Sequence, residues 1–99
     1  MQIEMSYVNL RFTQEVDRMI RRKKKRGEMS RRVCAALSSI DLSIVSLTEI
    51  RGEARCQMTQ VAVPEPLYLR GKALAAQREC SFNRLVNSAV KAHLGDSRP

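Results

Sequence analysis

The chain contains a stretch of strict alternation near its start, YVNLRF at residues 7–12. Alternation of apolar and polar residues is typical of a β-strand that buries one face and exposes the other. The side chains expected in the core are those of Val8, Leu10 and Phe12. No second strand follows within hairpin distance. The partner must therefore lie elsewhere, because buried backbone N–H and C=O groups need hydrogen bonds.

A second alternation occurs 51 residues further along, in MTQVAV at residues 58–63. Its inward residues are expected to be Thr59, Val61 and Val63. Each strand is followed by two stretches of helical periodicity, so the order strand, helix, helix occurs twice. The second helices correspond at an offset of 53 residues, which places two additional residues in the turn between the helices of the second half.

The helices of the first half are expected within TQEVDRMIRRKKKRG and EMSRRVCAALSSI. Thr13 is a favourable N-cap, acidic residues occupy the first turn, and Gly27 is expected to end this helix. The start of the next helix remains open between Glu28, a weak cap, and Ser30, a better one.

In the second half, Pro64 is expected to end the strand and to lie in the first turn of a helix. The face of that helix consists of Leu67, Tyr68, Leu74 and Ala75. Ser81 is the expected N-cap of the last helix, and Gly95 is its expected end. The last helix carries a strong apolar stripe: Phe82, Leu85, Val86, Ala89, Val90 and Leu94.

One domain, residues 1–99, is expected, with a first repeat at 6–40, a connector at 41–56 and a second repeat at 57–95. Each half of about 40 residues is too small for a core of its own. The two strands are therefore expected to pair antiparallel about a pseudo-twofold axis, with four helices behind them. The predicted fold class is mostly α with a small antiparallel two-stranded ribbon.

The connector is expected either to form a helix capped by Asp41 or to be irregular. It contains more apolar residues than a linker needs, and these either pack on the core or dock a partner: Leu42, Ile44, Val45, Leu47 and Ile50.

Charge indicates the class of partner. The net charge is +8 and the pI is about 10.1, which favours a polyanion, nucleic acid first and an anionic membrane second. Much of the excess lies in RRKKKR, residues 21–26, which either contacts phosphates or is a solvated helix end. The membrane alternative is weaker, because the helix over residues 13–26 has an apolar face of only Val16, Met19 and Ile20.

Several classes of protein are not expected. No apolar run approaches the roughly 20 residues of a membrane span, and the start of the chain does not resemble a signal peptide. Cys34, Cys56 and Cys80 match no zinc spacing and are expected to be reduced in an intracellular protein. His93 is expected to interact with a helix dipole rather than with a ligand. With no nucleophile beside a base and no Gly-rich phosphate loop, we expect no enzymatic activity, no metal and no cofactor.

The repeat resembles the ribbon-helix-helix family of DNA-binding proteins in three stretches: YVNLRFTQEV, VAVPEPLYLRGKALA and CSFNRLVNSAV. The Asn-Leu-Arg-aromatic order of the first strand is very like that of the Arc repressor. Most members of the family are homodimers with one copy per chain. Two unlike copies in one chain resemble the tandem, single-chain form found among accessory proteins of plasmid transfer, including the TraY type, and of T-DNA processing.

The resemblance implies a DNA-reading face. In this family the ribbon enters the major groove, and the outward residues of both strands read base edges. The matching positions are Tyr7, Asn9, Arg11, Met58, Gln60 and Ala62. Arg11 can pair with guanine, and Asn9 or Gln60 with adenine. Met58 and Ala62 depart from the usual polar choice. We therefore expect the first strand to carry most of the readout, and the preferred DNA site to be asymmetric.

Family members also hold phosphates at the N-terminus of the second helix of each repeat. The matching positions are Met29, Ser30 and Arg31 in the first half and Ser81, Phe82 and Asn83 in the second. The basic run would add further phosphate contacts: Arg21, Arg22, Lys23, Lys24, Lys25 and Arg26.

The expected function is sequence-preferring binding of double-stranded DNA by a monomeric pseudo-dimer in the bacterial cytoplasm. The role implied by the resemblance is that of an accessory factor in plasmid or T-DNA processing and transfer, with other DNA-processing proteins as further partners and higher assembly on DNA left open. The alternative is an antitoxin-like transcriptional repressor or a protein-interaction module.

Overall fold

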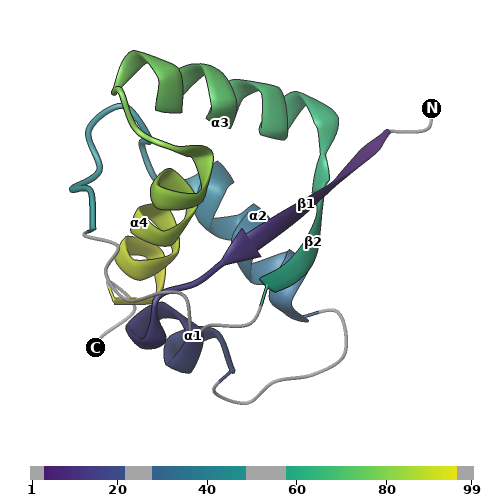
Figure 1. Cartoon of the computed structure of the whole chain (residues 1–99), viewed down its shortest axis with the longest axis vertical. Helices are drawn as coiled ribbons and strands as arrows, with labels where there is room; N and C mark the ends of the chain where they lie inside the picture. Colours follow the sequence, from purple (N-terminus) through teal and green to yellow (C-terminus); the bar gives the residue numbers. More distant parts are fainter. Residues whose placement is uncertain (1–3, 22–27, 49–57, 96–99) are drawn as a thin grey trace.

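The computed structural model describes residues 4–21, 28–48 and 58–95. Within these ranges, two strands form an antiparallel ribbon that is accompanied by four helices (Figure 1). The element order is β1 (Met5–Arg11), α1 (Gln14–Arg21), α2 (Glu28–Ser39), β2 (Met58–Pro64), α3 (Glu65–Gln77) and α4 (Phe82–Gly95). The prediction of a mostly α fold with a small two-stranded antiparallel ribbon is confirmed.

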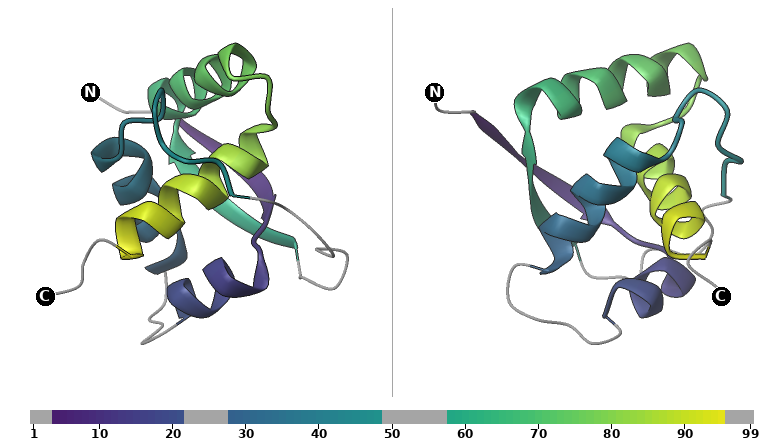
Figure 2. Two further views of the ribbon diagram at one scale, coloured as in Figure 1. Left: turned by 90° about the vertical axis from the view of Figure 1, so that its left-hand side faces the viewer. Right: turned by 180° about the vertical axis from the view of Figure 1, so that it is seen from behind.

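The two strands pair as predicted, although they lie far apart in the sequence. Asn9 lies opposite Gln60, and the pairing extends from Met5 opposite Pro64 to Arg11 opposite Met58. Helices α2 and α4 lie across one face of this ribbon, whereas α1 and α3 lie near its two ends (Figure 2). None of the helices in the described residues covers the other face of the ribbon.

The core lies between the ribbon and the helices, and its members are aliphatic apart from Phe12. Leu10, Phe12, Val61 and Val63 are buried, as predicted for the inward face. Val8 and Thr59 are only half-buried. The helices α2 and α4 complete the core with a set of fully buried side chains: Val33, Ala36, Leu37, Leu85, Val86, Ala89 and Val90. Burial of each large aliphatic side chain stabilises the fold by about 1.5–3 kcal/mol before the entropy of ordering it is counted.

Helix α1 begins where the sequence predicts. The Val16 N–H donates to Thr13 Oγ1 at 3.1 Å, and the Asp17 N–H donates to the Thr13 carbonyl at 2.8 Å, so Thr13 is the N-cap. The predicted end at Gly27 lies outside the described residues. Helix α2 begins at Glu28, so Ser30 is not the cap.

Helix α3 follows β2 directly, and Pro64 is its N-cap with φ −54° and ψ 135°, one residue before the predicted first-turn position. Of the predicted face, Ala75 is buried, whereas the other three residues are half-buried. Gly71 is also buried, and a Cβ built there would lie 2.7 Å from Cε1 of Phe82. Glycine at this position therefore permits close packing of α3 on the start of α4.

The turn between α3 and α4 contains a non-glycine residue with positive φ, Glu79 at 55°. The Glu79 N–H donates to the Ala76 carbonyl, and the Cys80 N–H donates to the Ala75 carbonyl. This is the Schellman arrangement that commonly ends a helix. Helix α4 then starts after Ser81, whose Oγ accepts the Arg84 N–H at 3.1 Å, so the predicted N-cap is confirmed.

The described part of the connector, residues 41–48, is irregular and begins with a single turn at Asp41. Hydrogen bonds from Ser43 hold the pKa of the Asp41 carboxyl below its usual value. Leu42 and Val45 are buried in the core, whereas Ile44 is 76% exposed. Of the two alternatives for the connector, packing on the core holds for Leu42 and Val45 and in part for Leu47, which is half-buried against the core. Ile50 lies outside the described residues.

Candidate nucleic-acid interface

The six positions predicted to read bases lie on one face of the ribbon, in three directly opposed pairs. Tyr7 faces Ala62 across the ribbon, Asn9 faces Gln60, and Arg11 faces Met58. Tyr7 is 68% exposed and Met58 is 55% exposed. Asn9, Arg11 and Gln60 are also exposed, whereas Ala62 is half-buried. The structure thus brings all six residues together, with Arg11 near one end of the row.

One further residue extends this face. Met5 is 42% exposed and lies two positions before Tyr7 on β1, opposite Pro64. Residues two apart on a strand share a face, so the period of two could have identified Met5 from the sequence. It was missed because Ser6 breaks the alternation of apolar and polar residues at that point.

The backbone of Arg11 is held by two asparagines of α4. Its N–H donates to Asn83 Oδ1 at 2.8 Å, and its carbonyl accepts a hydrogen bond from Asn87 Nδ2 at 3.0 Å. Asn87 is fully buried, and its Oδ1 also accepts the N–H of Thr13 at 2.8 Å. The strand end that carries Arg11 is therefore fixed to α4 through side-chain amides. Sequence reasoning missed Asn87, whose one signal is a polar residue inside an apolar stripe.

The backbone of Ala62 on β2 is held at the equivalent atoms by α2. Its N–H donates to Ser30 Oγ at 3.1 Å, and the Cys34 thiol lies 3.5 Å from its carbonyl oxygen. Burial raises the pKa of the Cys34 thiol, which keeps the sulfur protonated as a weak donor. Ser30 precedes Asn83 by 53 residues, and Cys34 precedes Asn87 by the same interval. The hydrogen bonds thus follow the offset of the sequence repeat.

The two ends of the outward face differ in charge. Arg11 is the cation at one end. Beyond Met5, at the other end, the Glu65 N–H donates to the Glu4 carbonyl at 2.9 Å. The hydrogen bond and negative charge of the Glu4 carboxyl raise the pKa of Glu65. Two neighbouring carboxyl groups therefore lie at the end of the ribbon away from Arg11.

The positions predicted to contact phosphates lie at the first turns of α2 and α4, but several of their side chains have other partners. Met29 is buried in the core. The Phe82 ring packs edge-on against Tyr68, with 5.1 Å between ring centroids. Ser81 caps α4, and the side-chain oxygens of Ser30 and Asn83 accept N–H groups from the strands. Among the described residues at these positions, main-chain N–H groups, the exposed Arg31 side chain and the exposed Ser81 hydroxyl are available to an anion.

Known proteins do not identify this arrangement. No family model, curated protein or solved structure matches the chain. The geometry of the ribbon and of the helices behind it therefore carries the functional inference.

The basic run is placed only at its start. Arg21 is the last residue of α1, and Arg22, Lys23, Lys24, Lys25 and Arg26 lie outside the described residues.

Among the residues that the structure describes, no group of three or more His, Cys, Asp or Glu side chains could hold a metal ion. Cys34 and Cys80 are free thiols, and Cys56 lies outside the described ranges. No helix in residues 4–21, 28–48 and 58–95 is long and apolar enough to cross a bilayer.

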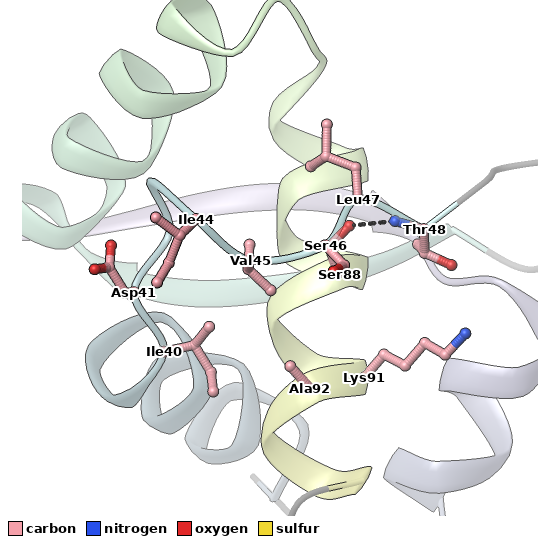
Figure 3. A pocket seen from close by; sticks show the side chains of 10 residues that line it. All are labelled: Ile40, Asp41, Ile44, Val45, Ser46, Leu47, Thr48, Ser88, Lys91 and Ala92. Carbon is pink, nitrogen blue, oxygen red and sulfur yellow. Dashed lines mark hydrogen bonds between the residues drawn. The ribbon is translucent and has the colours of Figure 1, made fainter.

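A groove lies on the side of α4 away from the ribbon, beside the connector (Figure 3). Its volume is about 490 Å³, and its walls come from the connector, the end of α2 and the second half of α4. The connector is held there by Thr48, whose N–H donates to Ser88 Oγ at 2.8 Å. Arg84 Nε donates to the Thr48 carbonyl at 2.9 Å, and Arg78 donates to carbonyls earlier in the connector. The apolar lining includes Ile40, Ile44, Val45, Leu47 and Ala92.

Proposed function

We propose that this chain binds double-stranded DNA with a sequence preference by inserting the β1–β2 ribbon in the major groove. The observation that carries the proposal is the outward face, where three opposed residue pairs are displayed and none of the described helices covers them. A two-stranded ribbon fits the major groove, in which each base pair presents a distinct pattern of donors and acceptors. The net charge of +8 supports a polyanionic partner.

The proposal includes a tandem ribbon-helix-helix architecture, in which one chain supplies both halves of a pseudo-dimer. Two observations support it. Asn9 pairs with Gln60, the residue that corresponds to it at the 51-residue offset, and the hydrogen bonds to Arg11 and Ala62 are equivalent. Because the two strands carry different outward residues, the preferred site is asymmetric. Arg11 supplies the strongest single readout through a bidentate contact to guanine, worth about 1–3 kcal/mol of discrimination.

Phosphate binding is assigned to the main-chain N–H groups at the first turns of α2 and α4, which point outward and carry the positive end of the helix dipole. Arg31 and the basic run at residues 21–26 add cationic contacts, so affinity falls steeply with salt. These contacts fix the orientation of the ribbon and leave discrimination between bases to the strands.

The test compares two variants that remove the same charge. A duplex is first selected from a randomised pool by the full chain, and dissociation constants are measured for it and for single base-pair changes. Arg11→Ala should reduce discrimination at one base pair by about 5–150-fold, the range that 1–3 kcal/mol corresponds to. Arg70→Ala on the exposed side of α3 should leave discrimination unchanged. Equal discrimination in the wild type and in Arg11→Ala would refute the proposal.

The biological role assigned is that of an accessory factor in plasmid or T-DNA processing in the bacterial cytoplasm. An antitoxin-like repressor would use the same ribbon, so the place of binding distinguishes the two roles. A footprint at a nick or transfer site supports DNA processing, whereas protection of the gene's own promoter supports repression. A protein-interaction module is favoured by the groove that leaves Ile44 exposed, and it becomes the better explanation if no duplex binds.

A further inference from the structure

We infer that Asn83 and Asn87 are positioning residues that set the placement of Arg11 for base reading, an inference that rests on the proposed function. Both asparagines lie behind the outward face and neither is exposed on it. They act on the backbone of Arg11, one at its N–H and the other at its carbonyl. The side chain of Arg11 is thereby presented from a main-chain segment fixed on both sides.

The buried amide of Asn87 has little freedom to move. Its Nδ2 donates to the carbonyls of Arg11 at 3.0 Å and Asn83 at 2.8 Å, and its Oδ1 accepts the N–H of Thr13 at 2.8 Å. Because Asn87 is fully buried, water cannot replace any partner that moves away. A shift of Arg11 away from α4 therefore leaves one donor of the buried Asn87 amide without its acceptor.

The corresponding contacts in the other half are weaker. Ala62 is held by a serine hydroxyl and a thiol, and a thiol is a poor donor. Ala62 presents only a methyl group to the outward face, so its placement matters less for base reading. The stronger hydrogen bonds lie under the residue whose bidentate contact has the stricter geometric requirement.

Asn83 also connects two parts of the proposed interface. It lies in the first turn of α4, where main-chain N–H groups are assigned to a phosphate, and its side chain accepts the N–H of Arg11 at 2.8 Å. A phosphate-bound helix end and a base-reading residue are thus joined through one amide. This link fixes the distance between the first turn of α4, which binds a DNA phosphate, and Arg11, which contacts a base. The Arg11 guanidinium therefore reaches the base edge when α4 is bound to the phosphate.

The experiment measures base discrimination, affinity for an unrelated duplex and thermal stability in the full chain. The probes are the duplex selected by the wild type and a second duplex with one base-pair change. That change is the one that the wild type discriminates against and Arg11→Ala does not. Asn83→Ala and Asn87→Cys should each reduce discrimination at that base pair by about tenfold, because a loosened bidentate contact loses most of its selectivity. Asn83→Ser retains an oxygen acceptor, as Ser30 does, and should restore part of the discrimination.

Two controls separate positioning from a general loss of structure. Ser88 is buried next to Asn87 on α4 but accepts the N–H of Thr48 in the connector. Ser88→Ala should therefore lower the melting temperature without changing discrimination. In an Arg11→Ala background, Asn87→Cys should cause no further loss, because a positioning residue acts only through the residue that it positions.

Unchanged discrimination in folded Asn83→Ala and Asn87→Cys would overturn the inference, as would a loss that adds to that of Arg11→Ala. If Asn87→Cys does not fold, Asn83→Ala decides the question alone, since its side chain makes a single hydrogen bond to the strand. A wild type without preference for any duplex refutes the proposed function, and the inference falls with it. A preference that depends on Arg11 but not on the asparagines refutes the inference alone.

Discussion

The hydrogen bonds at the ends of the two strands are unequal. This difference predicts that the loss of stability caused by a substitution at position 64 is compensated by a substitution at position 34. Asn87 accepts the N–H of Thr13. At the offset of the repeat, the residues that correspond to Asn87 and Thr13 are Cys34 and Pro64, and Pro64 has no N–H to donate. Cysteine suffices there because no acceptor is required. Pro64→Thr should therefore need Cys34→Asn, since the two substitutions together recreate between α2 and the end of β2 the hydrogen bonds that Asn87 of α4 makes at the end of β1.

The magnitudes follow from the groups left without partners. Pro64→Thr alone adds an N–H without an acceptor, at a cost of about 1–3 kcal/mol. Greater freedom of the unfolded chain adds about 0.4–1 kcal/mol. Cys34→Asn alone places an amide oxygen without a donor beside β2, at a similar cost. The double variant satisfies both groups, so it should be more stable than the sum of the singles by about 1–3 kcal/mol. Pro64 is half-buried, which allows some access of water and places the expected value in the lower half of this range.

The assay is urea denaturation of the wild type, both single variants and the double variant, followed by far-UV circular dichroism. A matched control combines Pro64→Thr with Cys80→Asn. Cys80 is also a half-buried thiol, but it lies beyond the far end of α3, about 20 Å from Pro64 by the rise of a 13-residue helix. The reasoning is refuted if the coupling free energy between positions 34 and 64 is below about 0.5 kcal/mol or equal to that of the control. Either result would show that position 34 is not equivalent to position 87.

Two further predictions concern stability and are checked by urea denaturation. Glu79→Gly should stabilise the fold by about 0.5–1 kcal/mol, because glycine relieves the positive φ at the end of α3. Gln77→Gly at the last residue of the same helix should destabilise the fold by up to about 1 kcal/mol, and equal effects of the two glycine substitutions would contradict the explanation. Gly71→Ala should cost about 1–3 kcal/mol, because the new Cβ would lie 2.7 Å from the Phe82 ring. Phe82→Leu in that background should recover part of the loss, and no recovery would exclude this clash as the cause.

The pairing of the strands could be predicted because it depends on features visible in the sequence. The period of two identified the inward residues Leu10 and Val61, and the repeat identified a partner for a strand that had none nearby. N-caps such as Thr13 and Ser81 were equally accessible, since capping depends on residues three positions apart.

The hydrogen bonds that hold the ribbon could not be predicted in the same way. Asn87 bonds to residues 74 and 76 positions away, and nothing local distinguishes it from a polar residue at the edge of a helix. Ser30 was one of two candidates for the cap of α2, because its residue type favours that position, but α2 begins two residues earlier and the Ser30 hydroxyl accepts an N–H of β2. The connector shows the same limit, because the carbonyls of the buried Leu42 and Val45 accept hydrogen bonds from Arg78, more than 30 residues away in the sequence.

The distance along the chain between the two strands has a consequence for synthesis. Arg11 precedes Pro64 by 53 residues, so a ribosome adding about 5–20 residues per second leaves β1 without its partner for about 3–10 s. During that interval β1 is an unpaired edge that can pair with another nascent chain. Helix α1 has only eight residues and packs mainly on α4, so its stable formation also waits for the second half, as closing the ribbon waits for β2. The order of emergence from the ribosome thus makes the first strand the segment most exposed to misassembly, and the second strand the one that ends this exposure.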